Sequence, residues 1–266
     1  WASVPSASVE TDASSAPAAR PDRRRRAWPW WIGIGAALAI IALLGTWLGS
    51  AQSSSTETLD PDGRGMYGAR ALAEILRDGG VDVIVTRSHT EAQRLLTDTP
   101  QSTLVTTGAT YISDDTWESL FTAAHDVVLL DPFAPLELAL PGTSLGPYTS
   151  SELVAPECAL PAAERAGSIQ PGRTLVSPNA TECYPMGDGF GLVVGERDGQ
   201  GTAAIVDAAQ LFTNEFLAKD GNAALALNLM GRNATLVWYV PTLGDSDITT
   251  PARTLGDLTP GWVTPA

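Results

Sequence analysis

Two kinds of apolar pattern alternate along the chain after about residue 57. Stretches with an apolar residue at every third or fourth position predict helices, and short β-branched runs predict strands. Because the two alternate, the pattern favours an α/β domain with a mostly parallel sheet covered by helices on both faces. The predicted helices are Met66–Asp78, Glu91–Leu96, Asp114–Ala124 and Asn222–Met230, and the predicted strands are Val81–Thr86, Thr103–Thr107, Asp126–Leu130, Leu192–Glu196, Thr202–Asp207 and Thr235–Val240.

The alternation is interrupted between Pro132 and Ala166, where proline and glycine are frequent and the periodicity is low. We interpret this stretch as an insertion or long loop that contains a short strand. After it, the strands Leu192–Glu196 and Thr202–Asp207 flank a turn at residues 197–201. This spacing predicts a strand pair joined by a tight connection.

Residues 27–50 form an uncharged apolar segment with tryptophans toward both ends. About 20 apolar residues in a helix cross the hydrocarbon core of a bilayer, and tryptophan favours its two interfaces. Four arginines, Arg23–Arg26, directly precede the segment and predict a cytoplasmic N-terminal side. We therefore predict a transmembrane helix in the plasma membrane. A cleaved signal peptide is the alternative, although its apolar core is normally only about 7–15 residues long.

The anchor divides the chain into five predicted parts. Residues 1–26 are rich in alanine, serine and proline, and we expect a disordered cytoplasmic tail. Residues 27–50 form the helix, 51–56 a polar spacer, and 57–243 an extracytoplasmic α/β domain. Residues 244–266 are rich in threonine, aspartate and proline and are expected to form a juxtamembrane tail.

Charge is distributed unevenly along the chain. The formal net charge is −14 at pH 7, although five arginines lie among residues 20–26. The remainder of the chain is therefore more acidic than the total suggests. Such a surface repels nucleic acid and anionic headgroups, so neither is an expected ligand of the domain, and the lipid bilayer is a partner of the anchor alone.

Cys158 and Cys183 are the two cysteines of the chain. Outside the cytoplasm, two thiols separated by a loop of this length usually form a disulfide. The alternative is a nucleophilic cysteine, which needs a nearby base. We predict a disulfide that ties the irregular stretch to the segment at Tyr184 and Pro185.

Residues 63–68 match the dinucleotide-binding pattern G-x-G-x-x-G and open a predicted helix. That site also needs a hydrophobic strand immediately before the glycines. The preceding residues 55–61 (STETLDP) are a poor strand, so we interpret the glycines as parts of a tight turn. Arg64 beside a helix N-terminus remains a candidate for binding an anion.

Other catalytic patterns lack their required context. Residues 142–146 match G-x-S-x-G, but a proline stands on each side, and both His89 and His125 lie upstream of the serine. His125, next to a predicted strand, is interpreted as structural. With two histidines and two cysteines, the chain offers no plausible zinc site, and it has no phosphate-binding G-x-x-x-x-G-K-[ST] loop. We expect no cofactor, no metal and no catalytic group.

Polar residues also follow three of the predicted strands. α/β sheets place ligands at the carboxyl ends of their strands. Thr106 and Thr107 end one predicted strand, Asp131 follows the next, and Asp207 ends a third. Together with Arg64, the residues Thr107, Asp131 and Asp207 are the candidate ligand-binding residues.

Several segments resemble the bacterial membrane family known as domain of unknown function 4350. The resemblance runs from about residue 57 to the C-terminus, and its most specific parts are Asn222–Leu229 (NAALALNL) and Val237–Pro241 (VWYVP). The other segments are Leu59–Pro61, Gly68–Leu76, Gly80–Val83, Cys158, Cys183–Tyr184 and Thr213–Glu215.

This resemblance implies a soluble domain similar to class I glutamine amidotransferases, a flavodoxin-like α/β fold, without an established activity. It also implies a second transmembrane helix after a segment like Leu258–Ala266, and an association with MoxR-type AAA+ ATPases and von Willebrand A-like proteins. The amidotransferase nucleophile is a cysteine supported by a downstream histidine. No histidine follows Cys158 or Cys183, which argues against that chemistry.

The sequence therefore favours a membrane-anchored, non-catalytic binding or scaffold protein with membrane protein partners. The alternatives are a cell-surface hydrolase that uses Asp131 or Asp207, and a sensor of an envelope ligand that uses Arg64.

Overall fold

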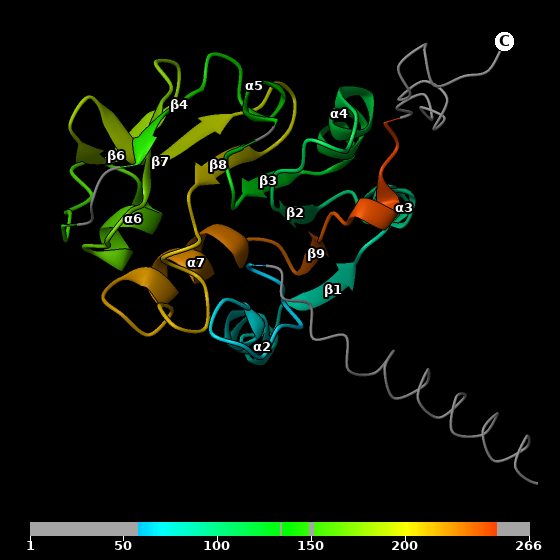
Figure 1. Cartoon of the computed structure of the whole chain (residues 1–266), viewed down its shortest axis with the longest axis horizontal. Helices are drawn as coiled ribbons and strands as arrows, with labels where there is room; N and C mark the ends of the chain where they lie inside the picture. Colours follow the sequence, from blue (N-terminus) through cyan, green and yellow to red (C-terminus); the bar gives the residue numbers. More distant parts are fainter. Residues whose placement is uncertain (1–57, 134, 149–151, 249–266) are drawn as a thin grey trace, which may run out of the picture. The chain divides into compact units, whose positions relative to one another are not determined.

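The structure is a computed structural model that describes residues 58–133, 135–148 and 152–248, which form a mixed α/β domain (Figure 1). The predicted transmembrane helix at 27–50, the tail before it and the spacer after it lie outside these residues. None of the helices in the described part combines the length and the apolar character that crossing a bilayer requires.

Nine strands of the described part form one sheet in the order β1-β9-β2-β3-β8-β7-β5-β4, with β6 also paired to β7. The five strands from β1 to β8 in this order are parallel, whereas β7, β5, β4 and β6 pair antiparallel. The strands are β1 Asp82–Thr86, β2 Ser102–Thr106, β3 Asp126–Leu129, β4 Ser144–Tyr148, β5 Arg173–Val176, β6 Thr181–Met186, β7 Gly189–Glu196, β8 Thr202–Val206 and β9 Thr235–Tyr239.

Helices cover both faces of the sheet (Figure 1). One face carries α2 (Arg70–Asp78), α6 (Pro161–Ala166) and α7 (Asn222–Met230). The other carries α3 (His89–Asp98), α4 (Asp114–Ala123) and the single-turn α5 (Leu136–Ala139). A 3-10 turn, η2 (Leu243–Asp245), follows β9.

Side chains that alternate along each strand pack into two separate apolar layers, one on each face of the sheet. In β9, Leu236 and Trp238 pack with α2, α6 and α7, whereas Val237 and Tyr239 pack with α3 and α4. All four side chains are fully buried. Such burial on both faces requires the near-continuous apolar runs from which the parallel strands were predicted.

The chain connections place three strand ends next to one another. The connections from β1 to β2 and from β2 to β3 run through α3 and α4 on one face. The connection from β8 runs through α7 on the other face and inserts β9 between β1 and β2. Ligands of open α/β sheets bind where connections diverge in this way, at the carboxyl ends of the strands.

The sequence predicted the parallel strands and the β7–β8 pair, but it missed much of the antiparallel part. Residues 132–166 contain the expected short strand, β4, and also the short helices α5 and α6. The strands β5 and β6 were not predicted, because β5 has only four residues and Pro185 interrupts the apolar pattern of β6. The sheet is therefore mixed, with its antiparallel strands gathered at one side.

The helix predicted from Met66 begins four residues later, at Arg70. The reason lies in Asn214, whose backbone N–H donates to the carbonyl of Gly68 (2.7 Å) and whose Oδ1 accepts from the amide of Ala71 (2.9 Å). These bonds hold residues 66–69 in a turn and occupy an N-terminal amide of α2.

The predicted disulfide between Cys158 and Cys183 is present in the structure. Cys158 lies in the segment before α6, and Cys183 lies in β6, where its side chain is fully buried. The next residue, Tyr184, donates its backbone N–H to the carbonyl of Pro156 (2.8 Å) and its hydroxyl to the carbonyl of Gly167 (3.1 Å). The bond therefore joins two segments that hydrogen bonds also hold together.

Replacing both Cys158 and Cys183 by alanine should lower the free energy of unfolding by about 3 kcal/mol, because the bond closes a loop of 25 residues in the unfolded chain. Urea unfolding with and without reductant measures the difference. Reductant should destabilise the natural chain and leave the double variant unchanged. Equal stability of the two proteins without reductant would contradict a stabilising role of the disulfide.

Candidate functional site

A small cavity of about 190 Å³ lies at the carboxyl ends of β2, β3 and β9. Thr107 directly follows β2, and Asp131 comes two residues after β3, so two of the predicted ligand-binding residues line the same cavity. The volume is below the roughly 300 Å³ at which drug-sized ligand sites begin, so the cavity suits a ligand of few atoms. The remaining lining residues are Thr58, Leu59, Tyr111, Trp238, Val240 and Pro241.

The acidity of Asp131 is shifted by its surroundings. Burial raises its pKa to about 6, and the negative charge of Asp207 acts in the same direction. The backbone N–H of Phe133 and the charge of Arg173 oppose the shift. Near neutral pH, a carboxyl group with this pKa exchanges between a hydrogen-bond donor and an acceptor.

Asp207 lies beside this site but does not line the cavity. Its carboxylate accepts hydrogen bonds from the backbone N–H groups of Arg173 (3.0 Å) and Ala209 (3.4 Å). A Cβ atom on Gly172 would stand 2.6 Å from Oδ2 of Asp207, so the close approach requires glycine at that position. Asp207 is therefore fixed by the backbone, and it acts on Asp131 through its charge.

Arg173 and Phe133, which the sequence did not indicate as candidates, also lie near Asp131. The guanidinium of Arg173 stacks over the exposed ring of Phe133, with 4.7 Å between Cζ and the ring centroid. Arg173 begins β5, and its neighbourhood with Asp131 results from the antiparallel part of the sheet. No local sequence pattern signals that pairing.

The two threonines at the end of β2 have different surroundings. Thr106 is buried, and its hydroxyl donates to the carbonyl of Thr107 (3.1 Å), which is a structural contact. Thr107 is partly exposed at the cavity wall. The described residues contain no group of three histidine, cysteine or acidic side chains that would hold a metal ion. Thr107 and Asp131 can hydrogen-bond a small polar ligand in the cavity.

Arg64 is separate from this cavity and lies exposed on the loop before α2. The side-chain amide of Asn214 donates to the carbonyls of Gly63 (2.9 Å) and Gly65 (2.6 Å) on both sides of Arg64. Gly63 and Gly68 are in direct backbone contact, because a Cβ on Gly68 would lie 2.1 Å from the carbonyl oxygen of Gly63. These glycines form a tight turn, as the sequence predicted.

The same loop is attached to the end of β1 by an ion pair between a buried carboxylate, Asp60, and an exposed arginine, Arg87. Asp60 is fully buried, and both of its oxygens accept from Nη2 of Arg87, at 3.0 and 2.9 Å. Arg87 also binds the exposed carboxylate of Asp62 (3.1 Å). Loss of Arg87 would leave the buried carboxylate of Asp60 without its charged partner.

The remaining sequence candidates are not near the cavity. Ser144 of the G-x-S-x-G match starts the edge strand β4, and no strand–helix elbow surrounds it. His89 begins α3, where its backbone N–H and ring face the carboxylate of Asp245. The carbonyl of His125 accepts the backbone N–H of Gly201 (3.1 Å).

The glycine contact predicts a difference between two alanine substitutions. Gly68→Ala should lower the free energy of unfolding by about 1–3 kcal/mol, since the new methyl group overlaps the backbone of Gly63. Gly65→Ala is the matched control, because no atom lies within 4 Å of the added carbon. Chemical denaturation measures both changes, and equal effects would contradict the packing role.

The raised pKa of Asp131 predicts a pH-dependent change in stability. The folded state holds a proton that the unfolded state releases near pH 4, so Asp131 destabilises the fold increasingly as pH rises from about 4 to about 6. The stability of Asp131→Asn relative to the natural chain should therefore rise across this interval, by on the order of 1 to 2 kcal/mol.

Carbon-13 NMR of labelled aspartate carboxyl groups measures the titration directly. Asp131→Asn assigns the resonance, and Asp207→Asn should lower the pKa of Asp131 by removing the neighbouring charge. A pKa of Asp131 at the ordinary value near 4 in the natural chain would refute the electrostatic description.

Two comparisons with known proteins give a match, one to a protein family and one to a single relative. Residues 61–230 match the family model described as domain of unknown function (DUF4350). An uncharacterized membrane protein of Mycobacterium tuberculosis is 32% identical over 248 residues, which is 90% of this chain and 61% of the relative. The chain thus spans less than two thirds of that relative's length, and no solved structure gives a significant match. The chain belongs to the DUF4350 family.

Proposed function

We propose that the chain is a membrane-anchored protein whose α/β domain acts outside the cytoplasm as a non-catalytic binding or scaffold module. The disulfide between Cys158 and Cys183 carries this proposal. Structural disulfides persist in oxidising compartments and are rare in the cytoplasm. The bond also occupies both thiols of the chain, so neither is available as a nucleophile.

Two further observations support the membrane anchor. The Mycobacterium tuberculosis relative is named a membrane protein, and residues 27–50 of this chain form an uncharged segment of suitable length. The arginines before that segment favour a cytoplasmic N-terminus and an extracytoplasmic domain. The lipid bilayer is then the partner of the anchor.

The domain is further proposed to resemble class I glutamine amidotransferases in fold while lacking their chemistry. Its five parallel strands with helices on both faces support the first part. Cys183 supports the second, since it lies disulfide-bonded and buried in the antiparallel strand β6, away from any strand–helix elbow at the carboxyl edge. We therefore propose no glutaminase activity for the domain.

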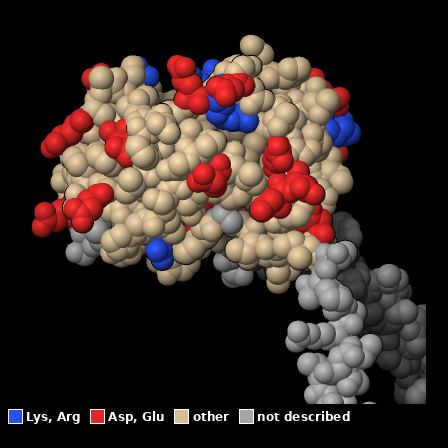
Figure 2. All heavy atoms as spheres, turned by 90° about the horizontal axis from the view of Figure 1, so that it is seen from above, with Lys and Arg blue, Asp and Glu red and all other residues tan. Residues whose placement is uncertain are grey.

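The proposed partners are other membrane proteins and a MoxR-type AAA+ ATPase system, as the family resemblance implies. Nucleic acid is not a proposed partner. The chain carries a net charge of −14, and acidic side chains are spread over the face in Figure 2, where basic side chains are few. A polyanion would meet repulsion across such a surface.

A second candidate function rests on the raised pKa of Asp131 in the carboxyl-edge cavity. Titratable groups with shifted pKa values are concentrated at functional sites, which favours a hydrolase or a sensor of a small envelope ligand. A hydrolase needs a second group that acts on the same ligand. Asp207 is held by two backbone amides and does not line the cavity, so binding is the better supported role.

Orientation is tested with single cysteines introduced into the full chain, whose natural cysteines are bonded to each other. Asp198 is exposed in the turn between β7 and β8, and Asp198→Cys should react with a membrane-impermeant maleimide on intact cells. Ser14→Cys in the N-terminal tail should react only after permeabilisation. Labelling of Asp198→Cys only after permeabilisation would overturn the proposed topology.

The scaffold role is tested by purifying the full chain from native membranes and identifying bound proteins by mass spectrometry. The matched control bait keeps the anchor and lacks residues 58–248. Membrane proteins and a MoxR-type ATPase should be enriched with the full chain alone. Equal recovery with both baits would contradict a partner-binding role of the domain.

A further inference from the structure

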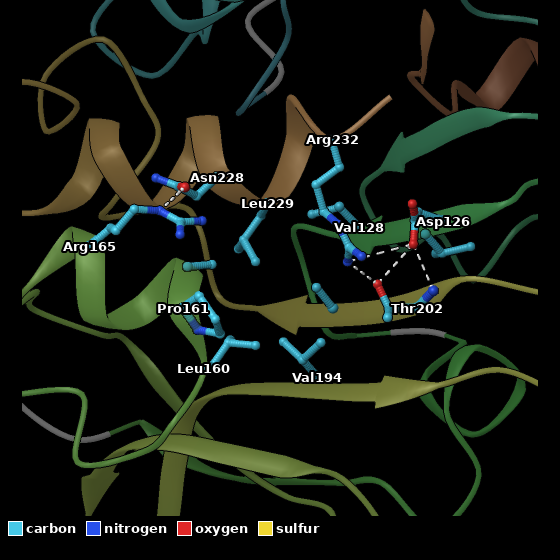
Figure 3. Close-up of a pocket in the computed structure, with 13 residues that line it drawn as sticks. Asp126, Val128, Leu160, Pro161, Arg165, Val194, Thr202, Asn228, Leu229 and Arg232 are labelled. Atoms are coloured by element: carbon cyan, nitrogen blue, oxygen red, sulfur yellow. Dashed lines mark hydrogen bonds and ion pairs between the residues drawn. The ribbon is translucent and has the colours of Figure 1, made fainter. Parts of the chain in front are cut away.

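A second and larger cavity, of about 310 Å³, lies on the face of the sheet that α6 and α7 cover (Figure 3). It is enclosed by α6, α7 and the strands β3, β7 and β8. Asp126 and Thr202, the first residues of β3 and β8, mark its position at the amino ends of these strands. The volume is within the range of small-molecule sites.

The floor of this α6–α7 cavity is apolar. Val128 projects from β3, Val194 from β7 and Leu229 from α7 (Figure 3). Ala204 of the neighbouring strand β8 also lines the cavity. Each of the four residues is less than a tenth exposed, so they form the base of the cavity. An apolar group placed there would be removed from water and stabilised by burial.

Arg232 stands at one end of the cavity, just after α7, with its guanidinium directed toward the cavity (Figure 3). Its Nη1 donates to the hydroxyl of Thr202 (2.6 Å) and lies 3.7 Å from the carboxylate of Asp126. That carboxylate already accepts the backbone N–H of Thr202 (2.7 Å), the Thr202 hydroxyl (2.9 Å) and the amide of Asn233 (2.8 Å). These contacts fix the position of the Arg232 guanidinium. Its positive charge is only partly compensated, because the carboxylate of Asp126 also accepts the hydrogen bonds of Thr202 and Asn233.

Arg165 on α6 also lines the cavity, on the other side of Leu229 from Arg232 (Figure 3). Its Nε donates to the side-chain oxygen of Asn228 on α7 (2.7 Å). This neutral amide fixes the guanidinium without compensating its charge. By contrast, Arg70, Arg87 and Arg94 each pair with carboxylates.

We propose that the α6–α7 cavity binds a small amphipathic anion. Its apolar chain would lie on Val128, Val194 and Ala204. Its carboxylate or phosphate would lie between Arg165 and Arg232 and accept hydrogen bonds from both. Planar guanidinium groups favour oxyanions of this geometry. The acidic charge of the rest of the surface opposes the approach of anions, but this repulsion is screened beyond about 8–10 Å at physiological ionic strength.

The cavity volume limits the ligand to a single short chain, so a bilayer lipid is not the proposed occupant. The site shares no lining residue with the carboxyl-edge cavity. The inference goes beyond the scaffold role and does not depend on it, because partner recovery and small-molecule binding are measured separately.

Hexanoate is the probe, titrated calorimetrically into the full chain in phosphatidylcholine nanodiscs, with the heat of empty nanodiscs subtracted. Arg165→Gln and Arg232→Gln should each weaken binding about tenfold, as expected for loss of a hydrogen bond to a charged group. Arg94→Gln on the exposed face of α3 is the matched control and should bind as the natural chain does. Hexanol and hexylamine should bind more weakly than hexanoate.

A second variant tests the apolar floor, with Ala204→Leu expected to fill the cavity and prevent binding. Thermal unfolding of each variant identifies those that remain folded. If Ala204→Leu does not fold, binding by the surface variants Arg165→Gln and Arg232→Gln decides the result. The proposal is overturned if hexanoate does not bind the natural chain at millimolar concentration, or if the folded double arginine variant binds it equally. The double arginine variant carries both Arg165→Gln and Arg232→Gln. The proposal is also overturned if only phosphatidylglycerol vesicles bind through Arg165 and Arg232.

Discussion

The sheet is buried on both of its faces by helices, and this burial determines where polar side chains can be placed. Each inner strand must supply apolar side chains to two layers at once, as Leu236 and Val237 do in β9. Polar groups are therefore confined to the two ends of the strands. The carboxyl end carries Asp131 and Thr107, and the amino end carries the Asp126 network, so both candidate ligand sites follow from the same layering.

The polar residues at these ends divide into structural and available groups. Asp60 forms an ion pair with Arg87, and Asp207 accepts hydrogen bonds from two backbone amides. Asp126 accepts hydrogen bonds from Thr202 and Asn233. What remains available is a carboxyl group with a raised pKa at one end and two arginines over an apolar floor at the other. This division supports recognition of small ligands and gives little support to a catalytic mechanism.

Sequence patterns predicted what depends on local periodicity, and they failed where distant contacts decide the structure. The apolar runs of β2, β3, β8 and β9 mark buried parallel strands with little ambiguity. The late start of α2 depends on Asn214, more than 140 residues away, and β5 is a strand only because β4 and β7 pair with it. At the candidate sites, the predicted ends of the strands were enough to identify Thr107 and Asp131 from the sequence. Arg173 and the pair of Arg165 and Asn228 could be identified only from the folded structure, because their neighbours are distant in the sequence.

A domain that works in an oxidising compartment outside the cytoplasm should keep Cys158 and Cys183 bonded in living cells, and the redox state of the two cysteines can be measured there. Growing cells are quenched with acid, and free thiols are alkylated with a reagent that adds a known mass. If the domain is extracytoplasmic, neither cysteine is alkylated until the denatured protein is reduced. Alkylation of both cysteines without reduction would contradict this location.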